Sequence, residues 1–402
     1  MNTTHLDRVT HLLRRHPLVD GHNDLAWAAR KLAAYDWDVL DIAGSTPTHT
    51  DLPRLTAGCV GAQFWSVFVP STLPPDQAVI QTLEQVDAVH TMIERYADRL
   101  GLARTAHGVG EVFASGRIAS LMGAEGGHSI GCSLGVLRML HALGVRYLTL
   151  THNDNTPWAD SATDQPVHGG LTPFGREVVR EMNRTGMLVD LSHVSADTMR
   201  DALATTQAPV IFSHSSARAI CSSPRNVPDD VLQTLAGNNG VCMAVFAPAF
   251  VSQECWDWRV AVDEAARAEG IEPTDLGAFV PFSQAYAVRH PRPKARLDQV
   301  VTHIEHLREV AGVDHIGIGG DYDGVPHLPV GLEDVSGYPR LFAELADRGW
   351  SDEDMVKLAG GNVLRVLGEA EVVAGELQSA RGPSLATIEQ LDGRTGDASG
   401  PR

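Results

Sequence analysis

The sequence predicts an α/β protein whose core is a closed (β/α)8 barrel. Eight short apolar runs rich in β-branched and aromatic residues recur along the 402 residues, and most are followed by a stretch with helical periodicity. Alternation of strands and helices predicts a parallel sheet, and a count of eight strands favours a closed barrel over an open, doubly wound sheet. A chain of this length with 43% hydrophobic residues can bury such a core.

The predicted strands are runs that end in polar or small residues. In chain order, they cover residues 18–24, 60–69, 118–127, 145–154, 187–195, 209–218, 240–251 and 315–324. The clearest helix is predicted over residues 76–100, where one apolar stripe is formed by Val79, Leu83, Val86 and Ile93.

The chain is expected to form one barrel domain over residues 1–370. Within it, residues 252–296 form a long insert with several Pro and Trp residues. An insert of this length suits a lid or a subunit contact, which leaves a homodimer open. Residues 371–402 are expected to form a polar, loosely ordered C-terminal tail.

The composition argues against some classes of partner. Acidic residues outnumber basic ones, 50 to 32, and the net charge of -18 is spread without a Lys/Arg-rich block, so we expect no binding to nucleic acid or anionic membranes. The N-terminus lacks the apolar core of a signal peptide, and no 18-residue apolar span or lipid-anchor signal follows. Five cysteines without a C-x-x-C pair indicate thiols in a reducing compartment. We therefore expect a cytoplasmic protein.

The first apolar run, LVDGHNDL, ends on two residues that often bind metals. Because side chains alternate along a strand, His22 and Asp24 should lie on the same side, a few ångströms apart. A single pair of this kind more often marks where a strand meets its loop than a metal site. The ends of the other runs decide between these interpretations.

Similar residues stand at the ends of most other predicted strands. In a (β/α)8 barrel the active site lies at the carboxyl ends of the strands. Besides His22 and Asp24, those ends carry Glu125, His152, His193, His214, Asp321 and Asp323. Their shared register favours a metal site over a series of unrelated loop caps.

Imidazoles and carboxylates in this number suit two zinc ions. One zinc ion takes three or four protein ligands, which is fewer than the strand ends offer. Paired ions about 3.5–4 Å apart can generate hydroxide at neutral pH and stabilise the oxyanion formed from an attacked carbonyl. The sequence therefore predicts a hydrolase with two Zn2+ per chain.

Two other functions stay open. GHSIG (127–131) fits G-x-S-x-G, the nucleophile elbow of serine hydrolases, although an elbow needs its serine directly after the strand and three residues precede Ser129 here. We expect Ser129 to be a helix N-cap instead. A catalytically silent metal-binding barrel should lack a proton-transferring acid, and Asp321 argues against it.

Seven segments together resemble the membrane (renal) dipeptidase family of the amidohydrolase superfamily, over residues 18 to 370. They are DGHNDL, GAEGGHSI, TLTHNDNTPWADSA, LVDLSHVS, IFSHSSARAI, RNVPDD and GIGGDYDG. The resemblance implies a (β/α)8 barrel with a binuclear zinc site that acts as a metallopeptidase on dipeptides. The sequence departs from the family pattern at Ala26, where proline is common, and in FAPAF (246–250), which lacks a tyrosine of membrane-bound relatives.

The resemblance also assigns the metal ligands. By that resemblance His22 and Asp24 bind one zinc ion, and His193 and His214 bind the other. Glu125 would bridge both ions, in the place where many relatives use a carboxylated lysine.

The remaining roles concern the substrate. The resemblance implies that His152 contacts the substrate carbonyl as it becomes an oxyanion, that Asp321 relays protons, and that Arg225 holds the C-terminal carboxylate. Asn226, next to Arg225, is expected to contact the substrate as well. The alternative for Arg225 is an ordinary salt bridge to Asp229 or Asp230.

We therefore expect zinc-dependent hydrolysis of dipeptides that have a free C-terminal carboxylate, with L,L and L,D configurations as substrates. The nucleophile would be a metal-bound hydroxide. A related barrel acting on N-acyl amino acids or lactones is the alternative within the hydrolases.

Overall fold

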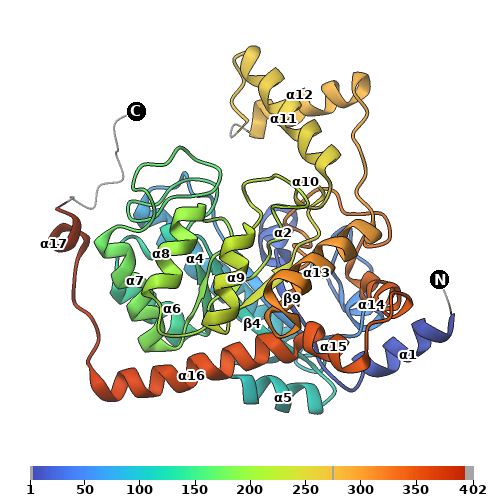
Figure 1. Cartoon of the computed structure of the whole chain (residues 1–402), viewed down its shortest axis with the longest axis horizontal. Coiled ribbons are helices and arrows are strands. Elements are labelled where there is room, and N and C mark those ends of the chain that lie inside the picture. Colours follow the sequence, from blue (N-terminus) through green and yellow to red (C-terminus); the bar gives the residue numbers. More distant parts are fainter. Residues whose placement is uncertain (1–2, 274–275, 394–402) are drawn as a thin grey trace.

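A closed ring of eight parallel strands forms the centre of the molecule, as predicted. The computed structural model describes residues 3–273 and 276–393. Its ring strands follow the order β2-β1-β9-β8-β7-β6-β5-β4, and pairing of β2 with β4 closes the barrel (Figure 1). Helices surround the ring on its outer side. The (β/α)8 fold predicted from the sequence is therefore confirmed.

Every ring strand lies within one of the eight predicted runs. They are β1 (Leu18–Asn23), β2 (Val60–Phe68), β4 (Ile118–Glu125), β5 (Val145–Thr149), β6 (Leu188–Asp190), β7 (Ile211–Phe212), β8 (Val241–Ala244) and β9 (Ile316–Ile318). A further strand, β3 (Leu100–Leu102), pairs only with the first residues of β4 and was not predicted. Its three residues are too few to show a strand pattern.

The strands are buried on both sides, which explains why they read as apolar runs rather than alternating ones. All ring-strand residues are buried except Phe68, the last residue of β2. Phe68 pairs with Glu125 of β4, which in turn pairs with Thr149 of β5. The carboxyl ends of these neighbouring strands therefore lie at one level, where a site can be assembled from several strands.

The helices follow the strands in the expected alternation. They are α1 (Thr3–Leu13), α2 (Leu25–Ala33), α3 (Leu52–Ala57), α4 (Pro75–Arg95), α5 (Ala106–Ala114), α6 (Leu134–Leu143), α7 (Pro173–Thr185), α8 (Ala196–Thr205), α9 (Asp229–Asn238), α10 (Pro248–Val251), α11 (Gln253–Ala268), α12 (Leu276–Arg289), α13 (Leu297–Ala311), α14 (Tyr338–Asp347), α15 (Asp352–Val356), α16 (Asn362–Ala380) and α17 (Ile388–Asp392).

The prediction of a buried apolar stripe on the helix at 76–100 was partly wrong. Val86 and Ile93 are buried as expected, but Leu83 is 40% exposed and the neighbouring Thr82 is fully buried. A buried threonine is tolerated here because its hydroxyl donates a hydrogen bond to the carbonyl of Ala78 one turn earlier. The helix also ends at Arg95, five residues before the predicted end.

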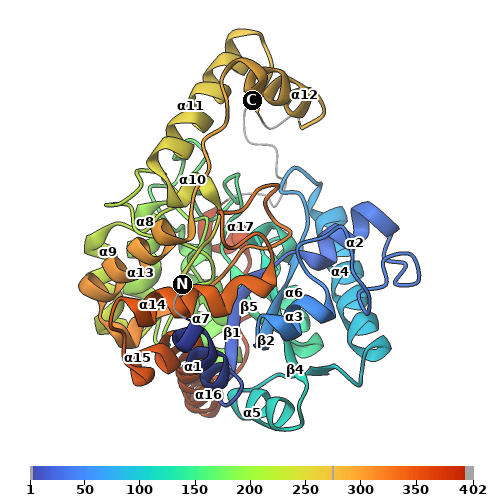
Figure 2. The same cartoon turned by 90° about the vertical axis from the view of Figure 1, so that its right-hand side faces the viewer.

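Residues 252–296, the expected insert, contain a pair of helices that stands away from the barrel. Helices α11 and α12 follow the carboxyl end of β8 through the short α10, and both views show them projecting beyond the other helices (Figures 1 and 2). They share a small core of their own, formed by Val262, Ala266 and Phe279 with Trp258 and Phe282 packed against it.

The segment expected to be a loose tail after residue 370 is in large part ordered helix. Helix α16 runs on to Ala380, because Ala370 and Ala374 continue its buried face. The chain then docks on α7, where the carboxylate of Asp392 accepts a hydrogen bond from the backbone N–H of Phe174. Residues 394–402 lie outside the described residues.

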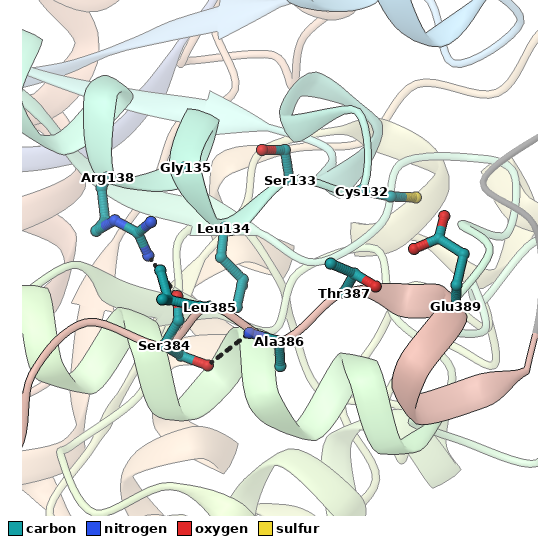
Figure 3. A pocket seen from close by; sticks show the side chains of 10 residues that line it. All are labelled: Cys132, Ser133, Leu134, Gly135, Arg138, Ser384, Leu385, Ala386, Thr387 and Glu389. Atoms are coloured by element: carbon teal, nitrogen blue, oxygen red, sulfur yellow. Dashed lines mark hydrogen bonds between the residues drawn. The ribbon is translucent and has the colours of Figure 1, made fainter.

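A cavity of about 270 Å³ lies between the start of α6 and the docked C-terminal segment (Figure 3). Its lining includes Cys132, Arg138 and Ser384, and Arg138 donates a hydrogen bond to the Ser384 carbonyl. None of the candidate metal or substrate residues lines it. The cavity is therefore a packing feature of the C-terminal segment and is separate from the chemistry at the strand ends.

Two further observations concern membrane spans and cysteines. In the part of the chain that the structure describes, no helix is both long and apolar enough to cross a membrane. All five cysteines are free thiols, and only Cys132 is partly exposed. The expectation of unpaired cysteines is confirmed.

Candidate metal centre

Three side chains from β1 and β4 converge at the carboxyl end of the barrel. His22 is the fifth residue of β1, and Asp24 directly follows that strand and precedes α2. The Nε2 atom of His22 lies 3.2 Å from Oδ2 of Asp24 and 3.5 Å from Oε2 of Glu125, the last residue of β4. The alternation that predicted a pair on one side of the strand therefore brings His22 and Asp24 together.

The other oxygen of the Glu125 carboxylate faces two histidines. Its Oε1 atom is 3.0 Å from Nε2 of His193, in the loop after β6, and 3.4 Å from Nε2 of His214, in the loop after β7. The carboxylate thus lies between two sets of nitrogen and oxygen atoms, with one of its oxygens directed to each. This arrangement suits a ligand that bridges two cations.

Within the described parts of the chain, possible ligand atoms form three overlapping groups, and all atoms of a group lie within 4.8 Å of one another. The groups are His22 with Glu125 and His214, Glu125 with His152 and His193, and His22 with Asp24 and Asp321. All residues that the sequence singled out as ligands belong to these groups, and His152 and Asp321 lie within the same distance.

The chemistry of these donors fits divalent cations. In the described part of the chain, the buried Nε2 atom of His22 has no hydrogen-bond partner. Burial raises the pKa of Glu125, and it raises the pKa of Asp321 well above its usual range, because the charged carboxylates lose hydration. A cation held among these groups would offset that loss. Imidazole nitrogens together with carboxylate oxygens are typical zinc ligands.

Three of the four histidines at the centre are in the state that metal binding requires. The exception is His22: burial acts to lower its pKa, but Tyr147 and the nearby carboxylates raise it well above its usual range. Burial lowers the pKa values of His152, His193 and His214 well below the usual range, and the positive charge of the nearby Arg225 acts in the same direction. These imidazoles are therefore neutral at neutral pH, and the neutral form is the one that donates a nitrogen lone pair to a metal ion.

Tyr147 supports His22 from inside the barrel. Its hydroxyl lies 2.8 Å from Nδ1 of His22 and donates a hydrogen bond of 3.2 Å to the carbonyl of Gly21. Since its one hydrogen goes to that carbonyl, the hydroxyl accepts from Nδ1, and a neutral His22 ring then presents the lone pair of Nε2. A side chain at the paired residue Gly123 would come within 1.9 Å of the Tyr147 ring. Tyr147 was not predicted from the sequence, where the paired glycine was the only signal for it.

Three residues at this end of the barrel adopt left-handed backbone conformations without being glycine. The φ angles are 68° for His193, 59° for Asp321 and 66° for Asp323. Such conformations carry a free-energy cost on the order of 1–3 kcal/mol each and are found preferentially at functional sites. Gly324 closes the same turn, and a Cβ atom there would lie 2.3 Å from carboxylate oxygens of both Asp24 and Asp321.

Asp321 and Asp323 have different surroundings. Asp321 belongs to the ligand group with His22 and Asp24, whereas Asp323 belongs to none of the three groups. The Oδ1 atom of Asp323 accepts a hydrogen bond of 2.7 Å from the backbone N–H of His49. Asp323 therefore holds the loop that contains His49, and Asp321 faces the metal centre.

His152 lies at the more open edge of the centre. Its side chain is 15% exposed, compared with 1% for His214, and its Nε2 atom is 4.0 Å from Oε1 of Glu125. The ring of Phe68 packs against it with the centroids 4.7 Å apart. His152 thus lies close to the candidate metal ligands, and its side chain is also accessible to solvent.

Arg225 is buried and short of hydrogen-bond partners. It is 2% exposed, and among the described residues neither its Nε nor its Nη1 atom has a hydrogen-bond partner. Burial lowers its pKa to about 10, against the attraction of Asp321 and Glu125, so the guanidinium stays charged at neutral pH. A buried cation with free donors is costly unless an anion binds it.

The alternative prediction, a salt bridge from Arg225 to Asp229 or Asp230, was wrong. Asp229 pairs with His306, and Asp230 pairs with Arg200. The guanidinium instead lies 5.1 Å from the ring centre of Phe250, which belongs to the FAPAF segment.

The expected contact between Asn226 and substrate finds no support. Asn226 is fully buried, its amide donates to the carbonyls of Cys221 and Phe250, and its side-chain oxygen accepts from the N–H of Ser216. All these bonds are internal. Asn226 therefore stiffens the loop that carries Arg225, a role that a single sequence does not distinguish from ligand binding.

The GHSIG segment does not form a nucleophile elbow. The hydroxyl of Ser129 donates to the carbonyl of Gly126, and the neighbouring His128 is hydrogen-bonded through Nε2 to the carbonyl of Val69. Ser129 lies within a short 3-10 helix (Gly127–Ile130), so its expected role as a helix N-cap was wrong; Ser133 caps α6 instead. Among the residues that the structure describes, the Ser129 hydroxyl is bonded to a backbone carbonyl and not to a histidine or carboxylate.

Comparison with known families agrees with this geometry. The family model described as membrane dipeptidase, peptidase family M19, matches residues 6–381. The chain belongs to this family. The dipeptidase barrel, with its histidines and carboxylates at the carboxyl ends of the strands, is thus placed among metal-dependent peptidases.

Individual relatives cover nearly the whole chain. Dipeptidase verJ of Clonostachys rogersoniana is 42% identical over 387 residues, which are 93% of this chain and 89% of that protein. Among solved structures, the probable dipeptidase PvdM from Pseudomonas aeruginosa has a TM-score of 0.83 at 25% identity and covers 93% of this chain and all of its own. A metallopeptidase from Rhodobacter sphaeroides, liganded with a phosphinate mimic of the dipeptide L-Ala-D-Ala, has a TM-score of 0.73 at 25% identity and covers 88% and 99% of the two chains.

Proposed function

We propose that this dipeptidase hydrolyses dipeptides with two zinc ions bound at the carboxyl end of its barrel. The observation that carries the proposal is the position of Glu125, whose two carboxylate oxygens face His22 on one side and His193 and His214 on the other. Five candidate ligand side chains exceed what one tetrahedral zinc ion uses. When bound, paired divalent ions supply an activated water nucleophile and polarise the carbonyl that it attacks.

The residues around the ligands would handle the proton and the developing charge. Asp321, whose pKa burial raises well above its usual range, is suited to take a proton from the nucleophile and pass it to the leaving amine. His152 is neutral and partly exposed beside the Glu125 carboxylate, which suits a hydrogen-bond donor to the oxygen of the attacked carbonyl.

Arg225 would select the class of substrate. Its guanidinium is charged, buried and without a carboxylate partner among the described residues, so a C-terminal carboxylate could accept two parallel hydrogen bonds from it. Dipeptides place that carboxylate one residue beyond the scissile carbonyl, and tripeptides place it one residue further. We therefore propose dipeptides as the preferred substrates.

We propose that both L,L and L,D dipeptides are cleaved. The related metallopeptidase from Rhodobacter sphaeroides binds a mimic of L-Ala-D-Ala, which supports a site that accepts a D residue at the C-terminal position. Free cysteines are also compatible with a reducing compartment, and we propose a cytoplasmic location on that basis.

A substrate screen combined with metal analysis tests the proposal. The unmutated protein and the matched Glu125→Gln variant should be assayed on L,L and L,D dipeptides, on an N-acetyl amino acid and on a lactone. We expect dipeptide turnover with about two zinc ions per chain in the unmutated protein, and loss of both in the variant.

Two outcomes would argue against the proposal. Full dipeptide turnover after chelation would exclude a metal-dependent reaction. Faster turnover of the N-acetyl amino acid or the lactone than of every dipeptide would favour the alternative substrates, because those compounds lack the free amino group of a dipeptide.

A further inference from the structure

Asp190 is a buried carboxylate at the end of β6, three residues before His193. Its Oδ1 atom accepts hydrogen bonds from the backbone N–H groups of Ser192 (3.1 Å) and Ser213 (2.8 Å). Its Oδ2 atom accepts from the hydroxyls of Ser213 (2.6 Å) and Thr149 (2.5 Å). Asp190 is fully buried. Two backbone N–H groups and two hydroxyls therefore satisfy its two oxygens.

The hydroxyl of Ser213 connects this carboxylate to a metal-site histidine. It lies 2.8 Å from Nδ1 of His214. An ionised carboxylate can only accept hydrogen bonds, so the single hydrogen of the Ser213 hydroxyl goes to Asp190. The hydroxyl oxygen must then accept from Nδ1 of His214. This direction leaves the lone pair on Nε2 of His214, which lies 3.0 Å from Nε2 of His193 and 3.4 Å from Oε1 of Glu125.

His214 differs from the other two imidazoles assigned to metal binding in the group that lies behind its ring. Besides the bond to its ring, its backbone N–H donates to the hydroxyl of Ser192. By contrast, the buried Nδ1 atom of His193 has no hydrogen-bond partner in the described residues, and Nδ1 of His22 meets the neutral hydroxyl of Tyr147. Only His214 is connected to a buried negative charge through a single hydroxyl.

We propose that Asp190 and Ser213 are positioning residues that hold His214 as its Nδ1–H tautomer with Nε2 directed to a metal ion. The inference rests on the proposed metal site. Carboxylate groups behind metal-bound histidines fix ring orientation and increase ligand basicity, and loss of such a partner typically weakens metal binding about 10- to 100-fold. The Asp190 charge would also partly balance that of the bound cations.

Zinc affinity of the metal-stripped protein tests this inference without any substrate. Competition with a chromophoric zinc chelator should show that Ser213→Ala weakens binding at one zinc site about 10- to 100-fold. The matched control is Thr149→Val, which removes the other hydroxyl bonded to the same Asp190 oxygen but leaves the Ser213 bond to His214 in place. The control should bind zinc nearly as tightly as the unmutated protein.

The outcomes separate this inference from the proposed function. Equal zinc affinity in Ser213→Ala and the unmutated protein, or equal losses in both variants, would overturn the role of Ser213. Absence of zinc binding by the unmutated protein would instead contradict the proposed function.

A second measurement covers the case in which Ser213→Ala fails to fold. Histidine-selective 15N labelling of the unmutated, zinc-free protein reports the tautomer of each imidazole, with the His214 signals identified by their absence in His214→Gln. The Nδ1–H form is expected for His214. The Nε2–H form would overturn the inference, because Ser213 would then donate to the ring rather than to Asp190.

Discussion

Asp321 and Asp323 stand two residues apart but face different groups. Asp321 lies with His22 and Asp24, whereas the Asp323 carboxylate binds the backbone of His49. The difference arises because both residues have left-handed backbone angles, which end the regular alternation of the strand. Strand alternation alone would place both acids on one face.

Asp321→Asn should lower kcat about 100- to 10,000-fold, the usual contribution of a positioned general acid or base. The amide keeps the size of the side chain but cannot carry the proton, so the zinc content should stay near that of the unmutated protein. Asp323→Asn is the matched control and should retain most of kcat. Steady-state kinetics and metal analysis on the same samples check this, and an inactive Asp323→Asn beside an active Asp321→Asn would reverse the assignment.

Arg225→Ala should lower kcat/KM for a dipeptide roughly 30- to 1000-fold while leaving zinc bound. The reason is that the buried guanidinium has free donors and no acidic partner among the described residues. The C-terminal amide of the same dipeptide should lose a similar factor with the unmutated protein. Arg200→Ala, which removes an exposed arginine paired with Asp230, serves as the control. Equal kcat/KM for the acid and the amide would show that Arg225 does not read the carboxylate.

At the scale of single residues, the sequence predicted which candidate metal ligands lie together. It did not predict the side chains that hydrogen-bond to those ligands. His22, Asp24, Glu125, His193 and His214 come together as predicted, because barrel topology brings strand ends to one place. Asp190 and Tyr147 were missed because they lie within apolar strands, where a buried polar residue has no distinctive spacing.

At the scale of elements, the loop of residues 151–172 links two members of the centre. Asp160 accepts hydrogen bonds from the backbone N–H groups of Val167, His168, Gly169 and Gly170, which folds the loop back on itself. The hydroxyl of Ser161 lies within hydrogen-bond distance of the carbonyls of His152 and His193. These contacts join residues far apart in the chain, so local sequence patterns do not predict them.

Helix α13 contains a buried imidazole that should make the fold sensitive to acid. The backbone N–H of Ala217 donates to Nδ1 of His303, whose Nε2 is hydrogen-bonded to the carbonyl of Val251. This arrangement requires the neutral ring. Burial lowers the pKa of His303 from its ordinary 6.5 to about 4, so between these pH values the unfolded chain binds more protons than the folded one.

The His303 contribution to stability should be complete above pH 6.5 and lost as the pH falls from 6.5 to about 4. Its size is on the order of 3 kcal/mol for a shift of this extent. Urea unfolding across this range should show a smaller fall in the free energy of unfolding for His303→Gln than for the unmutated protein, although the variant should be less stable at pH 7.5. Identical pH slopes would contradict the assignment.

At the scale of the whole molecule, the strand count and the helical alternation were sufficient to predict the barrel. The projection formed by α11 and α12 and the docked α17 could not be predicted in the same way. Both depend on contacts with a few residues, such as the bond from the Phe174 backbone to Asp392, rather than on a repeated pattern.

Metal removal should destabilise the whole barrel, because the centre draws buried groups from β1, β4 and the loops after β6 and β7. Zinc added to the metal-stripped protein at about 100 times its dissociation constant should stabilise the fold by about 2.7 kcal/mol. Glu125→Gln should lose most of the resulting increase in Tm, whereas Glu111→Gln, at an exposed glutamate of α5, should keep it. Calorimetry measures the Tm of each variant with and without zinc. Equal increases in Tm for both variants would argue against a ligand role for Glu125.

Anomalous diffraction from zinc-soaked crystals tests whether one carboxylate, that of Glu125, bridges two cations. Data collected on both sides of the zinc absorption edge locate each ion independently of any assumption about its ligands. We expect two peaks about 3.5–4 Å apart, one beside His22 and Asp24 and one beside His193 and His214, with Glu125 between them. A single peak, or two peaks out of reach of Glu125, would contradict a bridging role for Glu125.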